Sequence, residues 1–143
     1  MYLESIKTIV LASILIITNS LLHFEGQYPD SIGIHQGQLF ECNSMNHCTK
    51  KTKSVTNINK SFKHILKEVN SLPRTVVISY RGNYAHFKIS SAFFGFVDDL
   101  EIYADTRNDF IQIRSESRTG KLDFGVNRRR VEKLIAELED KII

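Results

Sequence analysis

The stretch from residue 93 to residue 130 constrains the fold more than any other part of the chain. Apolar side chains alternate with polar ones over residues 96–103 and again over residues 110–118, and this period of two is typical of strands with one buried face. Residues 105–109 between them are rich in Asp and Asn and predict a turn. Because a connection this short joins antiparallel strands, the stretch predicts two antiparallel neighbours.

Two further alternating segments, residues 75–80 and 84–91, precede this stretch. The turn signal Arg81-Gly82-Asn83 separates them, and short connections between consecutive strands favour an antiparallel meander. The same alternation assigns the side chains to faces. We expect one face to carry Val76, Ile78, Ala85, Phe87 and Ile89 beneath the helices, and the other to carry Tyr84, His86 and Lys88.

The register between the last two strands follows from aligning their apolar side chains, because a slip by one residue would place these opposite polar ones. This register pairs Leu100 with Ile113 and sets Asp98 beside Ser115 on the core face. We expect the opposite face to lie in water, as one face of an antiparallel sheet often does. Its members are Tyr84, His86, Lys88, Asp99, Glu101, Tyr103, Gln112, Arg114, Glu116 and Arg118.

Two amphipathic helices flank the strands. Apolar side chains recur at steps of three and four over residues 58–72, which predicts a helix. Thr56 or Asn57 can cap its start, and Pro73 stops it. A second helix with a similar apolar stripe begins near Asn127, which we expect to be its cap. Both helices are therefore expected to pack on one side of the sheet.

These elements predict one α+β domain: a four-stranded antiparallel meander sheet with two helices packed on one face, in the order helix, four strands, helix. One extra N-terminal strand around residues 38–42 would extend this sheet. We divide the chain into a signal peptide or N-terminal membrane anchor (residues 1–20), an irregular arm (21–56) and the α+β domain (57–143). A length of 143 residues suits a single compact domain.

The N-terminus has the order of a secretory signal. Lys7 precedes an apolar run over residues 8–17, and small and polar residues follow up to Ser20, where cleavage is expected. The run is shorter than the roughly 20 apolar residues of a membrane span, and a retained membrane anchor is the alternative. We therefore expect the chain to be exported, and to be either periplasmic or membrane-anchored facing the periplasm.

An exported chain meets an oxidising compartment, which favours a disulfide between Cys42 and Cys48. A zinc site would recruit His35 and His47, but the usual ligand pairs spaced by two to four residues are absent, so we expect no metal. A net charge of +3 is mild for a protein that binds phosphates, so no nucleic acid is expected as a partner. No Gly-x-Ser-x-Gly, His-Glu-x-x-His or phosphate-binding glycine motif occurs, so we assign no catalytic residue and no cofactor.

Asp98 breaks the apolar pattern of the core face, and a buried carboxylate needs a partner. Three arginines, residues 128–130, stand in the first turn of the second helix, where each cation opposes the helix dipole by roughly 0.3–1 kcal/mol. Either nearby carboxylates pair with these arginines as a polar latch, or an external anion binds there with help from Arg118. The candidate residues are Asp98, Arg114, Ser115, Ser117, Arg118, Asp123, Asn127, Arg128 and Arg130.

Three motifs stand out: FFGFVDD at residues 93–99, RSESRTG at 114–120 and DFGVNRRR at 123–130. Together they resemble the signature of the domain-of-unknown-function family numbered 1499. Cys42 and Cys48 keep the spacing of a cysteine pair in that family. The resemblance covers nearly the whole chain after its N-terminal segment. It implies a bacterial or plastid-type protein that is commonly exported, and it implies no activity.

These observations favour a non-enzymatic binding or scaffolding module at the periplasm or membrane surface, with a membrane surface or a protein as its partner. The alternative is an enzyme or carrier for a small anionic ligand at the loop of Arg118, Arg128 and Arg130. The geometry around Asp98 separates the two hypotheses. Paired arginines indicate a structural latch, whereas an open, arginine-lined cavity indicates a binding site.

Overall fold

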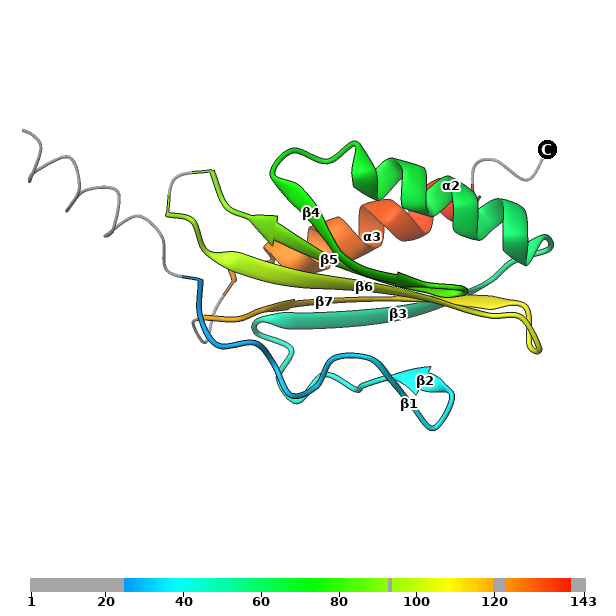
Figure 1. Ribbon diagram of the computed structural model, residues 1–143, viewed down its shortest axis with the longest axis horizontal. Coiled ribbons are helices and arrows are strands. Elements are labelled where there is room, and N and C mark those ends of the chain that lie inside the picture. Colours follow the sequence, from blue (N-terminus) through cyan, green and yellow to red (C-terminus); the bar gives the residue numbers. More distant parts are fainter. Residues whose placement is uncertain (1–24, 93, 120–122, 140–143) are drawn as a thin grey trace, which may run out of the picture.

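The computed structural model describes residues 25–92, 94–119 and 123–139 (Figure 1). The fold is α+β, as predicted: two helices lie on one face of an antiparallel sheet, and an extended segment lies on the other (Figure 1). We call this segment, residues 25–47, the arm. In chain order the elements are β1 (Ile34–His35), β2 (Gln38–Leu39), β3 (Cys48–Ser54), α2 (Ile58–Asn70), β4 (Thr75–Arg81), β5 (Tyr84–Ser90), β6 (Val97–Asp105), β7 (Phe110–Ser117) and α3 (Val126–Glu139).

The main sheet has five strands in the order β3-β7-β6-β5-β4, so the prediction of four strands is wrong. The additional strand is Cys48–Ser54, a segment that we expected to be irregular. Its sequence, CTKKTKS, has no apolar alternation because it forms an edge of the sheet, where charged side chains also discourage pairing with other molecules. The extra strand expected around residues 38–42 belongs elsewhere: Gln38–Leu39 pairs with Ile34–His35 in a separate two-stranded sheet.

The register between β6 and β7 differs from the prediction by two residues. Leu100 pairs with Ser115, and Asp98 pairs with Ser117. The strands continue to the pair Asp105 and Phe110, because the Asp105 carboxylate accepts hydrogen bonds from backbone N–H groups in the turn and tightens it. A shift by two residues leaves every side chain on its predicted face.

Strand β4 contradicts the predicted faces. Val76 pairs with Lys88, so it lies on the face opposite the helices, and the register shifts between Val77 and Ser79 as in a β-bulge. Val76 and Ile78 are 53% and 43% exposed, which fits an edge strand and not the core. The predicted core positions on β5 are correct, since its apolar side chains are buried beneath the helices.

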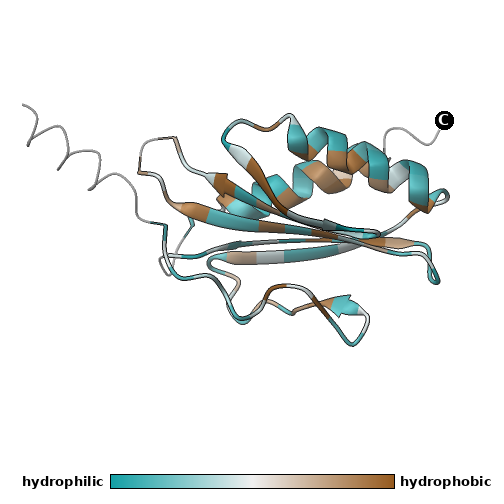
Figure 2. Cartoon of the chain, viewed as in Figure 1, coloured by the Kyte–Doolittle hydropathy of each residue, from teal (hydrophilic) through white to brown (hydrophobic). Residues whose placement is uncertain are grey.

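The helices cover the sheet with apolar stripes. Asn57 caps α2 by accepting the backbone N–H of Lys60, and α2 ends at Asn70 with Ser71 as its C-cap, just before the predicted stop at Pro73. Bands of hydrophobic residues recur along both helices and the strands beneath them (Figure 2). The buried core between these layers consists of Val55, Ile58, Phe62, Ile65, Val69, Ala85, Phe87, Ile89, Leu100, Ile102, Ala104, Ile111, Ile113, Val131, Leu134 and Leu138.

The face of the sheet opposite the helices is buried, which overturns its predicted exposure to water. Glu101 is 0% and Arg114 is 1% exposed. The arm crosses this face, where Leu39 packs against Tyr84 and Tyr103 (Figure 1). The polar side chains of this face therefore contact the arm and not water.

Within the described ranges, no helix is long and apolar enough to cross a membrane. The predicted signal peptide or anchor, residues 1–20, lies outside the described residues, and the division of the chain into three regions stays a prediction.

Candidate functional site

Five polar side chains from β6, β7 and α3 form one hydrogen-bonded cluster at the end of the sheet. Arg130 Nη2 donates to Asp98 Oδ2 at 2.9 Å, and Ser117 Oγ donates to Asp98 Oδ1 at 2.5 Å. Asn127 Nδ2 donates to Ser117 Oγ at 2.9 Å. Ser115 Oγ and Arg130 Nη1 both donate to Asn127 Oδ1, at 2.5 and 2.7 Å. We call these five residues the polar latch.

The polar latch holds the first turn of α3 against the sheet. Asn127 and Ser115 are both 0% exposed, so their hydrogen bonds replace bonds to water that burial removes. Because Arg130 supplies the charge partner of Asp98, the carboxylate on the core face is not left unpaired. Arg130 also places a cation near the start of α3, which the helix dipole opposes, and the ion pair with Asp98 offsets that cost.

Asp123 caps α3, which corrects the prediction that Asn127 is the cap. Its two carboxylate oxygens accept the backbone N–H groups of Gly125 and Asn127, each at 2.8 Å. Burial opposes the charged form of Asp123, but these backbone donors outweigh burial and lower its pKa below the usual value. Arg128, by contrast, is exposed and forms no ion pair within the part of the chain that the structure describes.

On the opposite face of the sheet, Asp99 is the centre of a second polar cluster. Arg118 binds both of its carboxylate oxygens, with Nε to Oδ2 at 2.8 Å and Nη2 to Oδ1 at 2.9 Å, and His86 Nε2 lies 2.7 Å from Oδ1. Burial disfavours the charged carboxylate, but the hydrogen bonds from Arg118 and His86 prevail and lower the pKa of Asp99. Tyr28 of the arm covers this cluster, with its ring 5.2 Å from the Arg118 guanidinium carbon.

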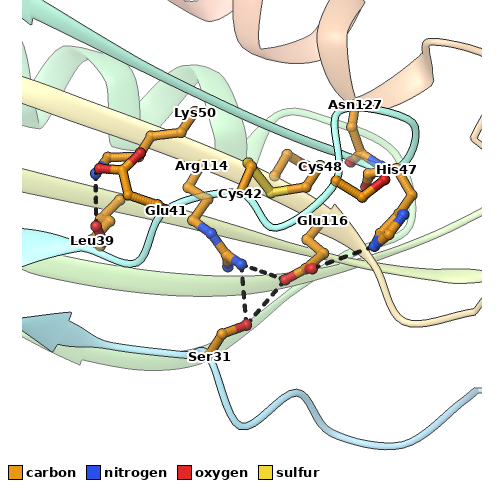
Figure 3. The surroundings of a disulfide bond; sticks show 12 residues. Ser31, Leu39, Glu41, Cys42, His47, Cys48, Lys50, Arg114, Glu116 and Asn127 are labelled. Carbon is orange, nitrogen blue, oxygen red and sulfur yellow. Dashed lines mark hydrogen bonds and ion pairs between the residues drawn. A yellow bond between two sulfur atoms is a disulfide. The ribbon is translucent and has the colours of Figure 1, made fainter.

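A third cluster is centred on Arg114. This arginine pairs with Glu101 at 2.9 Å and with Glu116, and it donates to Ser31 of the arm at 3.1 Å. Figure 3 shows Arg114, Glu116 and Ser31 pointing toward one another, with His47 approaching Glu116 from the other side. Burial and then the charge of Glu101 raise the pKa of Tyr84, which donates to Glu101.

The arm is held by backbone contacts as well as by side chains. The N–H of Gly33 donates to Glu101 at 2.7 Å, and the N–H of Leu39 donates to Gln112 at 2.9 Å. Gly26 has φ +70° and lies so close to the segment after β7 that a Cβ atom there would overlap Thr119 Cγ2. The arm is therefore fitted to the polar face of the sheet along much of its length.

The predicted disulfide is confirmed. Cys42 and Cys48 are bonded, with their Cα atoms 5.5 Å apart, at the junction of the arm and β3 (Figure 3). The loop that the bond closes contacts α3, because the carbonyl of His47 accepts from Asn127 Nδ2 at 3.2 Å and that of Asn46 accepts the N–H of Asp123 at 3.1 Å. The disulfide loop thus contacts the polar latch at Asn127, in addition to the sheet and α3.

The sheet divides the candidate residues predicted from the sequence into separate groups. The polar latch brings together the group on the helix-covered face: Asp98, Ser115, Ser117, Asn127 and Arg130. Asp123 lies beside it as the cap of α3. Arg114 and Arg118 lie on the other face, beneath the arm, and Arg128 is exposed.

One group could hold a metal by residue type: His64, Glu68 and Glu137, between α2 and α3. Glu68 lies 3.9 Å from Nδ1 of His64 and Glu137 lies 3.9 Å from Nε2. Because the two carboxylates approach opposite nitrogens of the ring, the arrangement suits a pair of ion contacts between the helices when the histidine is protonated.

Sequence reasoning missed a group of exposed aromatic residues at one end of the molecule. Phe94 and Phe96 lie in the loop between β5 and β6, with ring centroids 5.6 Å apart, and Phe124 precedes α3. Phe94 is 62% and Phe124 87% exposed. We call these three residues the aromatic end. The phenylalanines of the FFGF and DFG motifs were the available signal, but apolar residues in such motifs are more often buried.

In Figure 1 the loop between β5 and β6, the start of the described chain and the start of α3 lie toward the same end of the molecule.

The model of a family described as "Protein of unknown function (DUF1499)" matches residues 37–138, which run from the arm through α3. No curated protein matches the chain, and no solved structure matches it.

Proposed function

The chain belongs to the DUF1499 family, and we propose that it is a non-enzymatic binding module that works on the exported side, at the surface of a membrane. The observation that carries this proposal is the aromatic end with its neighbouring cations. Three exposed phenylalanines at one end of a small domain are unusual, and an exposed apolar patch on a soluble surface commonly marks an interaction site.

The charges around the aromatic end favour an anionic bilayer as the partner. Arg128 and Arg129 follow Phe124 closely in the chain, and both are exposed. Aromatic side chains that enter the headgroup region together with arginines or lysines are typical of proteins that lie on membranes. Each Arg or Lys near an anionic surface contributes about 1 kcal/mol of attraction.

The place where the described chain starts also supports a membrane at this end. Glu25, where the described chain starts, forms ion pairs with Lys88 and Arg118 close to the aromatic end. Only residues 18–24 separate it from the apolar run, and seven residues reach at most about 25 Å. A retained anchor would therefore hold the aromatic end against the bilayer, and a cleaved chain would reach the bilayer by the aromatic end itself.

The polar clusters support a module without catalysis. The hydroxyl groups of Ser115 and Ser117 donate within the polar latch, and His86 lies across the sheet from them. Arg118 and Arg130 each have a carboxylate partner, so these contacts favour a structural role for the loop over an open anion site there.

Vesicle sedimentation tests the proposal. The exported chain is mixed with vesicles of phosphatidylcholine alone or with one third phosphatidylglycerol, and binding is expected only to the anionic vesicles and to weaken with salt. The double variant Phe94→Ser/Phe124→Ser is expected to bind at least 10-fold more weakly, because a buried Phe contributes about 1.5–3 kcal/mol. Tyr80→Ser, at a 58% exposed aromatic on β4, is the matched control. Absence of binding by the unaltered cleaved chain would refute the proposal.

A further inference from the structure

A cleft beside the aromatic end has the features of a ligand site. Its volume is about 530 Å³, which lies within the range of roughly 300–1,000 Å³ common for small-molecule sites. It opens between the last turn of α2, the end of β5 and α3 from Val126 to Glu137. Ala92 and Val126, which line the cleft, stand next to the segments that carry the aromatic end.

The walls of the cleft are mainly apolar. Leu72 and Pro73 come from the turn after α2, Ile89 comes from β5, and Leu134 comes from α3. Ile89 and Leu134 belong to the buried core and are 6% and 3% exposed, so the floor of the cleft is the edge of the core itself. An apolar chain on this floor would be removed from water, at about 25 cal/mol for each Å² of apolar surface.

The charged residues of the cleft fall into two sets. The acidic ones are already engaged: Asp98 pairs with Arg130, while Glu68 and Glu137 flank His64 between the two helices.

Three cations remain at the rim. Arg74 uses Nε to donate to the carbonyl of Ser90, and Arg129 uses Nη1 to donate to the carbonyl of Phe124. Their other N–H groups, and the Lys133 ammonium, form no hydrogen bond or ion pair with the described part of the chain. All three side chains belong to exposed residues, so they can turn toward a ligand at low cost.

We propose that this cleft binds an amphiphile with one apolar chain and an anionic head. The chain would lie on the floor formed by Ile89 and Leu134, and the carboxylate or phosphate head would bind the guanidinium and ammonium groups of Arg74, Arg129 and Lys133. The proposal extends the membrane-surface function, since the cleft opens beside the aromatic end and such molecules reside in the bilayer. The ligand proposal differs from the membrane-surface function because it requires a molecule bound in the cleft.

Displacement of the fluorescent anionic probe anilinonaphthalene sulfonate from the exported chain tests this proposal. The competitors are laurate and lauroyl-lysophosphatidylglycerol, with dodecanol as the uncharged chain and inorganic phosphate as the head alone. We expect both anionic amphiphiles to displace the probe at least 10-fold more effectively than dodecanol, and phosphate to have no effect. Preference for laurate would identify a free fatty acid as the source, and preference for the second competitor would identify a lipid headgroup.

Charge-reversed variants locate the site. Arg129→Glu/Lys133→Glu is expected to bind laurate at least 10-fold more weakly and to bind dodecanol unchanged. Arg128→Glu is the matched control, because Arg128 is exposed on the same helix but does not line the cleft, and it should keep laurate binding within about twofold. Ala92→Trp, which narrows the cleft, should weaken both ligands. Laurate binding no stronger than that of dodecanol, or unchanged in the charge-reversed variant, would overturn the proposal.

The same experiment separates this proposal from the membrane-surface function. Phe94→Ser/Phe124→Ser is expected to lose binding to anionic vesicles and to keep laurate binding, because neither phenylalanine lines the cleft. Vesicle binding without laurate binding would overturn the ligand site alone. Laurate binding without vesicle binding would support the ligand site and refute the docking of the aromatic end.

Discussion

Replacement of Arg114 by Met is expected to destabilise the fold more than any other single change on the arm-covered face. Arg114 is 1% exposed, and Met keeps much of its apolar stem while removing the guanidinium group. The change leaves Glu101, which is 0% exposed, without its cationic partner at 2.9 Å. It also removes the contacts that Arg114 makes to Glu116 and to Ser31 of the arm.

The size of the effect follows from the burial of Glu101. Removing one partner of a buried ion pair costs about 3–5 kcal/mol. Glu101 keeps two donors, the hydroxyl of Tyr84 and the N–H of Gly33, so we place the cost near the lower limit, at about 3 kcal/mol. A domain has a total stability of about 5–15 kcal/mol, so the loss is large. With an m-value of about 1–3 kcal/mol per M, the urea midpoint should fall by about 1–3 M.

Urea unfolding followed by far-ultraviolet circular dichroism measures this loss. The double variant Arg114→Met/Glu101→Gln removes both charges of this pair and is expected to be more stable than Arg114→Met alone, because position 101 no longer carries an unpaired buried charge. A cost below about 1 kcal/mol for Arg114→Met, or a double variant that loses the sum of both single losses, would refute the idea of a buried pair beneath the arm.

Three other changes test other contacts. Acid should weaken the fold through Asp99, because the pKa of this carboxylate is lower in the folded state than in the unfolded state. Its contribution to stability is complete above the unfolded-state pKa of about 3.9 and is lost as pH falls through the folded-state pKa. Asp99→Asn should therefore lose less stability than the unaltered chain between pH 5 and pH 3, as measured by urea unfolding. Cys48→Ser opens the disulfide loop and should cost about 2 kcal/mol by thermal unfolding, equal to the effect of reductant on the unaltered chain. Gly26→Ala should speed hydrogen exchange in the arm more than Gly37→Ala does, because both glycines have positive φ but only at Gly26 does the added Cβ also overlap Thr119.

The strands and helices of the core were predictable because they have simple periods. Alternation placed Leu100 and Asp98 on the helix-covered face, and the true register differs by two residues, which leaves that face unchanged. The polar latch could therefore be anticipated as a group, although its pairs could not. The two-residue difference depends on the Asp105 side chain, which tightens the turn, and periodicity carries no such detail.

The arm-covered face could not be predicted from its pattern. A strand face that carries Glu101 and Arg114 has the same sequence pattern whether water or an arm covers it, because charged residues are compatible with solvent and with buried ion pairs. The arm itself offers few apolar residues as a signal, and one of its main contacts is a backbone N–H, that of Gly33. Strand β3 was missed for a related reason: it is an edge strand rich in lysine, and its sequence has no apolar alternation.

Strand β4 shows the limit of alternation within a single strand. The register shift between Val77 and Ser79 changes which later side chains share a face, so the alternation that fits one half of the strand fails for the other. Nothing in the sequence TVVISYR marks the position of the shift.

The most direct test of the membrane-surface function uses the absence of tryptophan from the chain. Phe124→Trp places a single fluorescent reporter in the aromatic end, and Tyr80→Trp places one at an exposed aromatic position on β4. With vesicles that contain phosphatidylglycerol and brominated acyl chains, we predict a blue shift and quenching for Phe124→Trp and neither change for Tyr80→Trp. An unchanged Phe124→Trp spectrum, or equal quenching of both reporters, would contradict the proposal that the aromatic end contacts the bilayer.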